Sequence, residues 1–251
     1  MSAPEPRIGC SGFSYPHWRG GVFYPPRWPV KRELEFYAQQ FDTVELNSPF
    51  YRLPSAATFR RWAAGTPPGF EFAVKASRYI THMLHLRGAA PALRTFLQRA
   101  RQLGPKLGPV LFQFPSSWGV HLDRLEAFLP ALPTRYHFAF EFRHAAWFTP
   151  PVYAALQRRG AALCWAVHPG LPPPPLVATA SFVYLRLHAG RGRDGGFTPA
   201  ELRHWAKVLS QQRAAGRAVY AYFNNDSRGC AVRNARSLRR LLSNHQHRRR
   251  A

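Results

Sequence analysis

The chain carries, at residues 183–188, the stretch Val183-Tyr184-Leu185-Arg186-Leu187-His188. A β-strand sends residues i and i+2 to the same face, so Arg186 and His188 share one face of this otherwise apolar run. A buried charge without a partner is very costly, so such groups form pairs or serve a ligand. The stretch predicts a buried strand that ends at a polar site.

Five further apolar runs carry a charged or amide residue near their C-terminal end, at residues 43–47, 72–77, 110–114, 138–143 and 220–226. By the same spacing Glu45 lies on one face with Asn47, Lys75 with Ser77, and Glu141 with Arg143. Polar groups at the same end of successive strands are typical of a barrel whose active site lies at that end.

Helical patterns alternate with these runs. We expect strands at 7–12, 43–47, 71–76, 110–114, 138–142, 162–167, 182–187 and 219–223, and helices at 31–40, 56–64, 91–103, 122–129, 151–159, 199–214 and 231–242. This alternation predicts a parallel sheet with right-handed crossovers. Eight such strands in 251 residues predict an α/β fold, a single (β/α)₈ TIM-like barrel over 7–243 with flexible termini at 1–6 and 244–251.

Two details refine this prediction. The Pro-rich segment at 169–175 cannot be helical, so we expect an extended loop in place of the sixth crossover helix. The alternative is an open doubly wound sheet. Against it, the turn Gly9-Cys10-Ser11-Gly12 lacks the spacing of a dinucleotide-binding loop.

Sequence composition indicates the cellular compartment in which the protein is expected. The chain has no run of eighteen apolar residues, which argues against a membrane span, and Met1 to Arg7 lack the apolar core of a signal peptide. Its three cysteines are dispersed and odd in number, as expected for buried thiols in a reducing cytoplasm. We therefore expect a cytoplasmic protein.

The formal net charge is +23, from 35 Lys and Arg against 12 Asp and Glu. Such a charge is compatible with nucleic acid as a partner. However, just four of the basic residues are lysines, and apart from the tail at 248–250 the charges are scattered. Arginine-rich composition of this kind is also typical of GC-rich coding, so both readings stay open.

Several segments together resemble the YecE-like family, domain of unknown function 72, whose members are TIM barrels. The resemblance covers about residues 7–242 and is carried by the segments at 8–15, 17–20, 43–47, 50–55, 72–76, 80–82, 108–113, 141–144 and 222–226, with Trp147. It implies the barrel fold without implying an established activity. The family's barrel is similar to that of the endonuclease IV and xylose isomerase group, which is an analogy of fold alone. One departure is that family members usually carry an Asp near the position of Val167, where this chain has Ala166-Val167-His168.

The expected strand-end residues have mixed charge. Glu45, Glu141 and Asp226 are negative, and Lys75, Arg143 and Arg186 are positive. A site for several metal ions needs an excess of carboxylates and imidazoles, so this balance favours an organic anion held by arginine. A single metal ion held by Glu45, Glu141 and His188 is the alternative, and no motif identifies a cofactor. A further alternative is a plug of ion pairs without chemistry, although such layers are normally apolar.

We assign roles on this basis. The expected catalytic residues are Glu45, Glu141 and His188. The expected ligand-binding residues are Asn47, Lys75, Gln113, Arg143, Arg186, Asn224, Asp226, Tyr15 and Trp18. For Lys75 we expect an ion pair and keep a Schiff base as the alternative. Of the aromatic loop at 13–24, we expect Tyr15, His17 and Trp18 to be exposed contacts and Phe23 to be packed.

The remaining loops carry weaker signals. The Gly-rich loop at 188–196 and the loop at 224–229 either bind phosphate or are plain loops. His82 and His144 follow strands and could move protons, although a loop histidine with structural contacts is commoner.

The sequence thus predicts a TIM-barrel protein that binds a small anionic, phosphorylated or sugar-like ligand, as an acid/base lyase, isomerase or hydrolase if it is an enzyme. The alternatives are a nucleic-acid-binding or metal-dependent, nuclease-like protein and a non-catalytic ligand-binding module.

Overall fold

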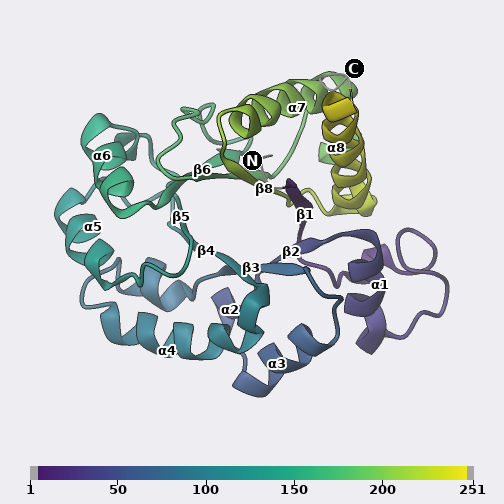
Figure 1. Cartoon of the computed structure of the whole chain (residues 1–251), viewed down its shortest axis with the longest axis horizontal. Coiled ribbons are helices and arrows are strands. Elements are labelled where there is room, and N and C mark those ends of the chain that lie inside the picture. Colours follow the sequence, from purple (N-terminus) through teal and green to yellow (C-terminus); the bar gives the residue numbers. More distant parts are fainter. Residues whose placement is uncertain (1–4, 248–251) are drawn as a thin grey trace.

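A computed structural model of the chain describes residues 5–247, and these residues contain eight strands in one closed parallel barrel with the order β1 to β8 (Figure 1). The strands are β1 Arg7–Ser11, β2 Thr43–Leu46, β3 Glu71–Lys75, β4 Leu107–Gln113, β5 Phe138–Glu141, β6 Ala162–Val167, β7 Phe182–Leu187 and β8 Ala218–Phe223. The predicted TIM-like barrel is confirmed.

Helices surround the barrel (Figure 1). They are α1 Glu33–Gln40, α2 Ser48–Tyr51, α3 Ala56–Ala64, α4 Ala90–Ala100, α5 Leu122–Phe128, α6 Pro150–Arg159, α7 Pro199–Ala214 and α8 Cys230–His247. No helix joins β6 to β7, as the Pro-rich segment predicted. The short helix α2 was not predicted, and α8 continues beyond the expected end of the domain at residue 243. The tail at 248–250 and residues 1–4 lie outside the described residues.

Local sequence accounts for several helix ends. Thr198 Oγ1 accepts a hydrogen bond from the backbone N–H of Glu201, and the N–H of Thr198 donates to the Glu201 carboxylate, which together form a capping box at the start of α7. Gly160 ends α6 in the left-handed conformation, with φ of 65°, which glycine adopts without strain. The first feature fixes where α7 begins, and the second fixes where α6 ends.

The barrel interior holds two layers. Aliphatic and aromatic side chains and one cysteine fill its centre: Ala73, Leu111, Ala139, Ala162, Cys164, Phe182, Tyr184, Tyr220 and Tyr222. Polar side chains follow at the C-terminal ends of the strands, where Ser11 is paired in register with Glu45 and Gln113 with Glu141. The parallel register therefore brings strand-end residues from distant parts of the sequence into one layer.

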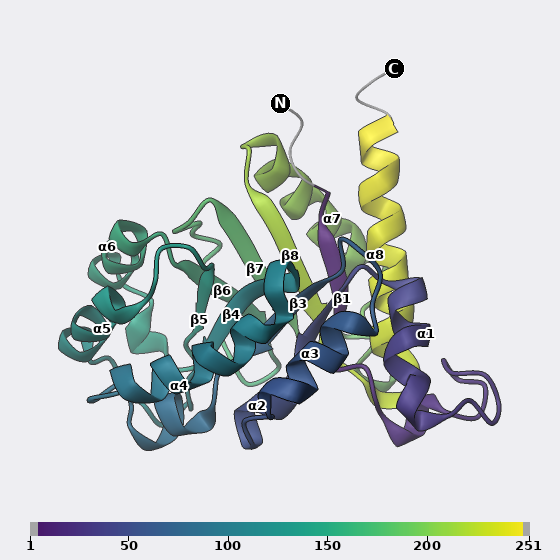
Figure 2. The same cartoon turned by 60° about the horizontal axis from the view of Figure 1, so that its bottom comes forward.

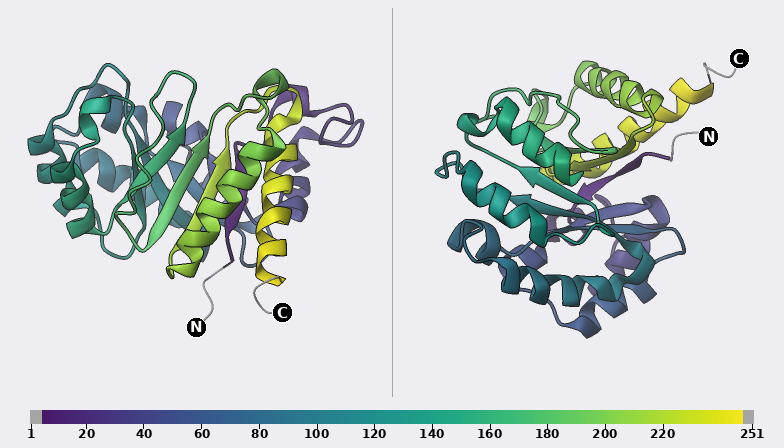
Figure 3. Two further views of the ribbon diagram at one scale, coloured as in Figure 1. Left: turned by 90° about the horizontal axis from the view of Figure 1, so that it is seen from above. Right: turned by 60° about the vertical axis from the view of Figure 1, so that its left-hand side comes forward.

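The two ends of the barrel differ in their coverings. Figure 2 shows α2 beyond the C-terminal ends of the strands, whereas α8 extends to the opposite end. In Figure 3 the start of β1 and the end of α8 lie together at that opposite end. The polar layer is thus far from the chain termini and next to the loops that follow the strands.

Candidate functional site

Arg186 is the centre of the polar layer. Its guanidinium donates from Nη2 to Glu45 Oε1 at 2.7 Å and from Nη1 to Glu141 Oε2 at 2.6 Å, and all three side chains are fully buried. Burial alone would lower the pKa of Arg186, but Glu141 and Glu45 raise it above its usual range. One arginine therefore holds two carboxylates contributed by β2 and β5.

Glu45 has donors on both oxygens. The Tyr184 hydroxyl donates to Oε2 at 2.7 Å, and the Ser11 hydroxyl donates to Oε1. Arg186 Nε adds a bond of 3.0 Å to Oε2. Sequence analysis did not single out Ser11 and Tyr184. The i, i+2 rule could have found Tyr184, because it lies two residues before Arg186 on the same face of β7.

Glu141 is held between three basic groups. Arg143 Nε donates to its Oε1 at 2.8 Å, and His188 Nε2 lies 3.8 Å from the same oxygen. Burial would raise the pKa of Glu141, but Arg186 and Arg143 hold it well below its usual range. The carboxylate therefore stays ionised, as an anchor for cations.

His188 is uncharged at neutral pH. Burial, followed by the nearby positive charge of Arg186, lowers its pKa to about 3. Its Nε2 lies 3.3 Å from Arg186 Nη1, and since a guanidinium can only donate, Nε2 accepts. With Nε2 accepting, the neutral ring carries its proton on Nδ1, which lies 2.9 Å from the side-chain amide of Asn224. His188 thus contacts Arg186 and Asn224 without adding charge to the layer.

A cavity of about 630 Å³ lies at this end of the barrel. Its lining contains Tyr15, Asn47, Phe50, Tyr51, Lys75, His82, Gln113, Pro115, Ser116, Arg143, Arg186 and Asn224. Seven of the expected ligand-binding residues are in this set. Glu45, Glu141 and His188, which we expected to be catalytic, are not.

Lys75 differs from the expectation that it forms an ion pair. Within the described residues its Nζ has no carboxylate partner and no hydrogen bond, and it lies 3.8 Å from the centre of the Phe50 ring. The expectation is wrong because Arg186 already occupies both nearby carboxylates. Burial and then the charge of Arg186 lower the pKa of Lys75 to about 8.

The unpredicted elements α2 and the π-helical turn Tyr79–Met83 shape the cavity wall. The helix α2 contributes Phe50 and the exposed Tyr51. The turn contributes His82, whose Nδ1 lies 2.9 Å from Thr81 Oγ1. Burial and the charge of Lys75 lower the pKa of His82 to about 4, so it is uncharged at neutral pH.

Two expected ligand contacts lie elsewhere. Trp18 is fully buried, and its indole N–H donates to the carbonyl oxygen of Asp226 at 2.9 Å, so the expected exposed contact is wrong. Its ring packs on Tyr15 and Phe23, and Phe23 is packed as expected. The Asp226 carboxylate lies 3.2 Å from His17 Nε2 and does not line the cavity. Two carboxylates, not three, therefore face the cations of the site.

The Gly-rich loop after β7 uses its backbone internally. The N–H groups of Gly190 and Gly192 donate to the carbonyls of Gly195 and Gly196, and that of Gly196 to the carbonyl of Arg193. A Cβ at Gly190 would lie 2.6 Å from the Gly196 oxygen, which explains the glycine by close approach. These N–H groups are thus not available to cradle a phosphate.

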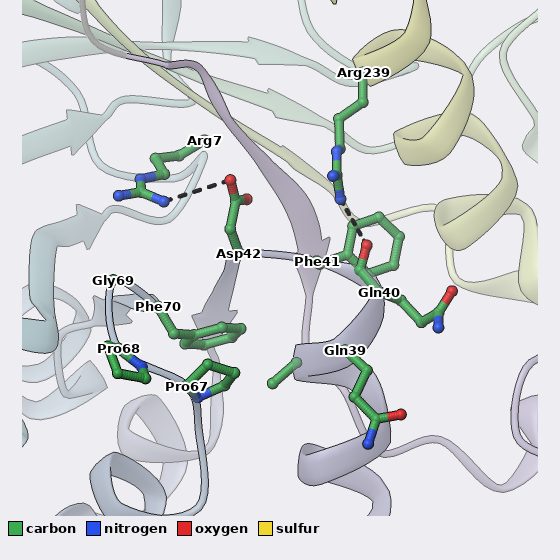
Figure 4. A pocket seen from close by; sticks show the side chains of 11 residues that line it. Arg7, Gln39, Gln40, Phe41, Asp42, Pro67, Pro68, Gly69, Phe70 and Arg239 are labelled. Atoms are coloured by element: carbon green, nitrogen blue, oxygen red, sulfur yellow. Dashed lines mark hydrogen bonds and ion pairs between the residues drawn. The ribbon is translucent and has the colours of Figure 1, made fainter.

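A second hollow, of about 380 Å³, lies at the opposite end of the barrel (Figure 4). Its charged groups have protein partners: Arg7 bridges Asp42 at 3.4 Å and Glu71 at 2.8 Å, and Arg239 donates to the Gln40 carbonyl at 2.6 Å. The N-terminal end of a TIM barrel usually stabilises the fold and does not bind the ligand.

The carboxylates and histidines do not gather into a metal-binding group. Among residues 5–247 no three His, Cys, Asp or Glu side chains are placed to hold one ion. Glu45 and Glu141, which formed the single-metal alternative with His188, are both bound by Arg186. None of the described helices is both long and apolar enough to cross a membrane.

Comparison with known proteins gives consistent results. The chain is 29% identical to the UPF0759 protein YunF of Bacillus subtilis, over 87% of this chain and 89% of that protein. It is 33% identical to the UPF0759 protein YecE of Escherichia coli K12, over 56% of this chain and 49% of that protein.

Solved structures agree. A DUF72 family protein (TM1631) of Thermotoga maritima matches 96% of this chain with a TM-score of 0.86 and 28% identity, and the match covers all of that chain. A second one (EF0366), of Enterococcus faecalis, matches 97% of this chain and 99% of its own with a TM-score of 0.75 at 20% identity, which supports the fold. The family model "Protein of unknown function DUF72" matches residues 7–251. The chain therefore belongs to the DUF72 family, as the sequence resemblance predicted.

Proposed function

We propose that the cavity at the C-terminal end of the barrel binds a small organic anion. The observation that carries this proposal is Lys75, a largely buried side chain whose ammonium faces the cavity and has no ion-pair or hydrogen-bond partner among the described residues. The polar layer contains two carboxylates and three cations, and the two carboxylates are taken by Arg186 and Arg143. An anion in the cavity would supply the missing partner and relieve the cost of the buried charge.

Other groups in the wall suit a ligand that carries hydroxyl groups as well. Arg143 uses Nε on Glu141 and keeps its terminal nitrogens for a carboxylate or phosphate. Asn47 adds a side-chain amide to the cavity lining, and its Oδ1 has no hydrogen-bond partner within the described structure. Phe50 and Tyr51 offer ring faces to the less polar part of the ligand. A phosphorylated or sugar-like anion fits this set.

Glu45, Glu141 and His188 act in this proposal as positioning residues, because they do not line the cavity. They hold Arg186 and Arg143 in place, and these two arginines with Lys75 are the cations that face the ligand. If the protein is an enzyme, the groups that touch its substrate are Lys75, Arg143 and His82. The three described cysteines are buried and unpaired, which supports a reducing, cytoplasmic setting.

The test is ligand-dependent thermal stability and calorimetry with inorganic phosphate and lactate, with neutral glycerol as a control. We expect both anions to stabilise the wild-type protein and the Lys207→Met control, in which an exposed lysine is replaced. Lys75→Met should lose the effect. Equal stabilisation of both variants, or none in the wild type, would contradict the proposal.

The nucleic-acid alternative has the net charge of +23 in its favour. It requires DNA or RNA binding whose affinity falls steeply with salt concentration. Absence of DNA or RNA binding at low salt would exclude the nucleic-acid alternative. Nucleic-acid binding that is unchanged in Lys75→Met would show that the nucleic acid does not use the cavity.

A further inference from the structure

We propose that Lys75 is a nucleophilic amine that forms a reversible imine with a small 2-oxo acid bound in the cavity. This inference rests on the proposed anion site and names the class of its ligand. It also assigns a chemical step to a residue whose amine has no ion-pair or hydrogen-bond partner within the described structure.

The surroundings of Lys75 are those of a reactive amine. An amine that is bound to a carboxylate is held protonated, and its lone pair is not available. Lys75 Nζ has no such partner among the described residues, and it projects from the end of β3 into the cavity above the Phe50 ring. Its pKa, lowered to about 8 by burial and by Arg186, leaves about a tenth of the amine uncharged at pH 7.

Lys106 provides the contrast within the same chain. Its Nζ donates to the carbonyls of Ala63 and Thr66, each at 2.6 Å, and to Thr66 Oγ1 at 3.0 Å. Three acceptors hold this ammonium in place, although burial lowers the pKa of Lys106 as well. Lys106 is a structural lysine, whereas Lys75 has kept its donors free.

The cavity also places groups for the rest of a 2-oxo acid. The terminal nitrogens of Arg143 can bind the carboxylate while Nζ attacks the adjacent carbonyl carbon. The attack forms the C–N bond, and the carbonyl oxygen takes up a proton to give a carbinolamine. A second proton on that oxygen lets it leave as water as the C=N bond forms, so that amine and carbonyl give imine and water.

His82 is the residue placed to move these protons. It lines the same cavity and is uncharged at neutral pH, with Nδ1 occupied by Thr81. Its Nε2 has no hydrogen bond within the described structure and is free to exchange a proton with the reacting groups. No oxidant or reductant is needed.

Borohydride trapping tests the inference. The protein is incubated with pyruvate or glyoxylate and sodium cyanoborohydride, which reduces an imine to a stable amine, and the adduct is located by peptide mass mapping. The chain has only four lysines, Lys31, Lys75, Lys106 and Lys207, so the assignment is direct. We expect at least a tenfold preference for Lys75, loss of the adduct in Lys75→Arg, and no loss in Lys207→Arg.

Labelling that is equal on the exposed Lys31 and Lys207, or unchanged in Lys75→Arg, would overturn the inference. Lactate, which lacks the carbonyl, separates it from the proposed function. If lactate binds by calorimetry and pyruvate gives no adduct on Lys75, the imine is excluded and the anion site stands. If lactate does not bind and pyruvate gives no adduct on Lys75, both proposals fail.

Discussion

The two ends of the barrel are built from the same residue types with opposite results. At the N-terminal end, Arg7 joins Asp42 and Glu71, Tyr220 donates to Glu71, and Lys106 is fully hydrogen-bonded. At the C-terminal end, Arg186 joins Glu45 and Glu141 and Tyr184 donates to Glu45, but among the described residues Lys75 has no ion-pair or hydrogen-bond partner. An ionic layer in which each cation has a protein partner stabilises a fold, whereas one that leaves a cation over is ready for a ligand.

The two arginines give the largest expected difference. Arg186→Met leaves two buried carboxylates without a cation, so we expect the free energy of unfolding to fall by about 4 kcal/mol. Arg7→Met breaks a partly exposed pair and should cost about 1 kcal/mol. Urea denaturation of the wild type and both variants measures these losses in the free energy of unfolding. Equal losses would show that the two layers are energetically alike.

The two lysines should differ in the sign of their effect. Lys75→Met removes a charge that burial opposes, and should stabilise the protein by about 2 kcal/mol at pH 7. Lys106→Met leaves carbonyls without their donor and should destabilise it by about 2 kcal/mol.

The pH dependence of the Lys75 effect gives a control. The folded pKa of Lys75, about 8, lies below its unfolded value. At pH values between these two pKa values, the unfolded chain binds more protons at Lys75 than the folded chain does. The free energy of unfolding therefore rises with pH in this range. The advantage of Lys75→Met should therefore shrink between pH 8 and pH 10. A pH-independent advantage would mean that packing, not charge, is its cause.

The two tyrosines test the hydrogen bonds to each layer. Tyr184→Phe removes a buried donor from Glu45 and should cost about 2 kcal/mol, whereas Tyr220→Phe removes a part-buried donor from Glu71 and should cost about 1 kcal/mol. Thermal and urea unfolding of the pair measure the difference. A larger loss of stability in Tyr220→Phe than in Tyr184→Phe would contradict this expectation, because it would mean that another donor replaces Tyr184 at Glu45.

His188 gives the smallest expected effect. Its folded pKa of about 3 lies below the unfolded value, so its contribution to stability is present above about pH 6.5 and is lost as the pH falls below that. Between pH 7.5 and 6 the wild type should lose about 0.8 kcal/mol more than His188→Gln. Parallel pH profiles of the two proteins would show that His188 keeps an ordinary pKa in the fold.

The sequence was sufficient to predict the barrel and most of the polar layer. Alternation of strands and helices located all eight strands, and the i, i+2 rule located Glu45, Lys75, Glu141 and Arg186 at one end. The failures have physical causes. Partner choice depends on which strands lie opposite one another, so the pairing of Arg186 with both carboxylates, and the isolation of Lys75 that follows, could not be read from one strand at a time.

Loop geometry explains the other errors. Trp18 and Asp226 are 208 positions apart and meet through a backbone carbonyl, a contact without a sequence signal. The helix α2 and the turn that carries His82 are too short for a periodic pattern, although they form one wall of the cavity. These residues of the cavity wall thus lie in loops and short helical turns, which the sequence predicts least well.

The most direct test of the central claim is an NMR titration of the lysine side chains, with ¹³C label at the ε-carbons. We predict that one of the four resonances titrates near pH 8, that it is absent in Lys75→Arg, and that its midpoint rises when phosphate is added. Titration of all four near pH 10 or above, or a low midpoint that phosphate does not move, would contradict the claim that Lys75 is an unpaired cation in an anion-binding cavity.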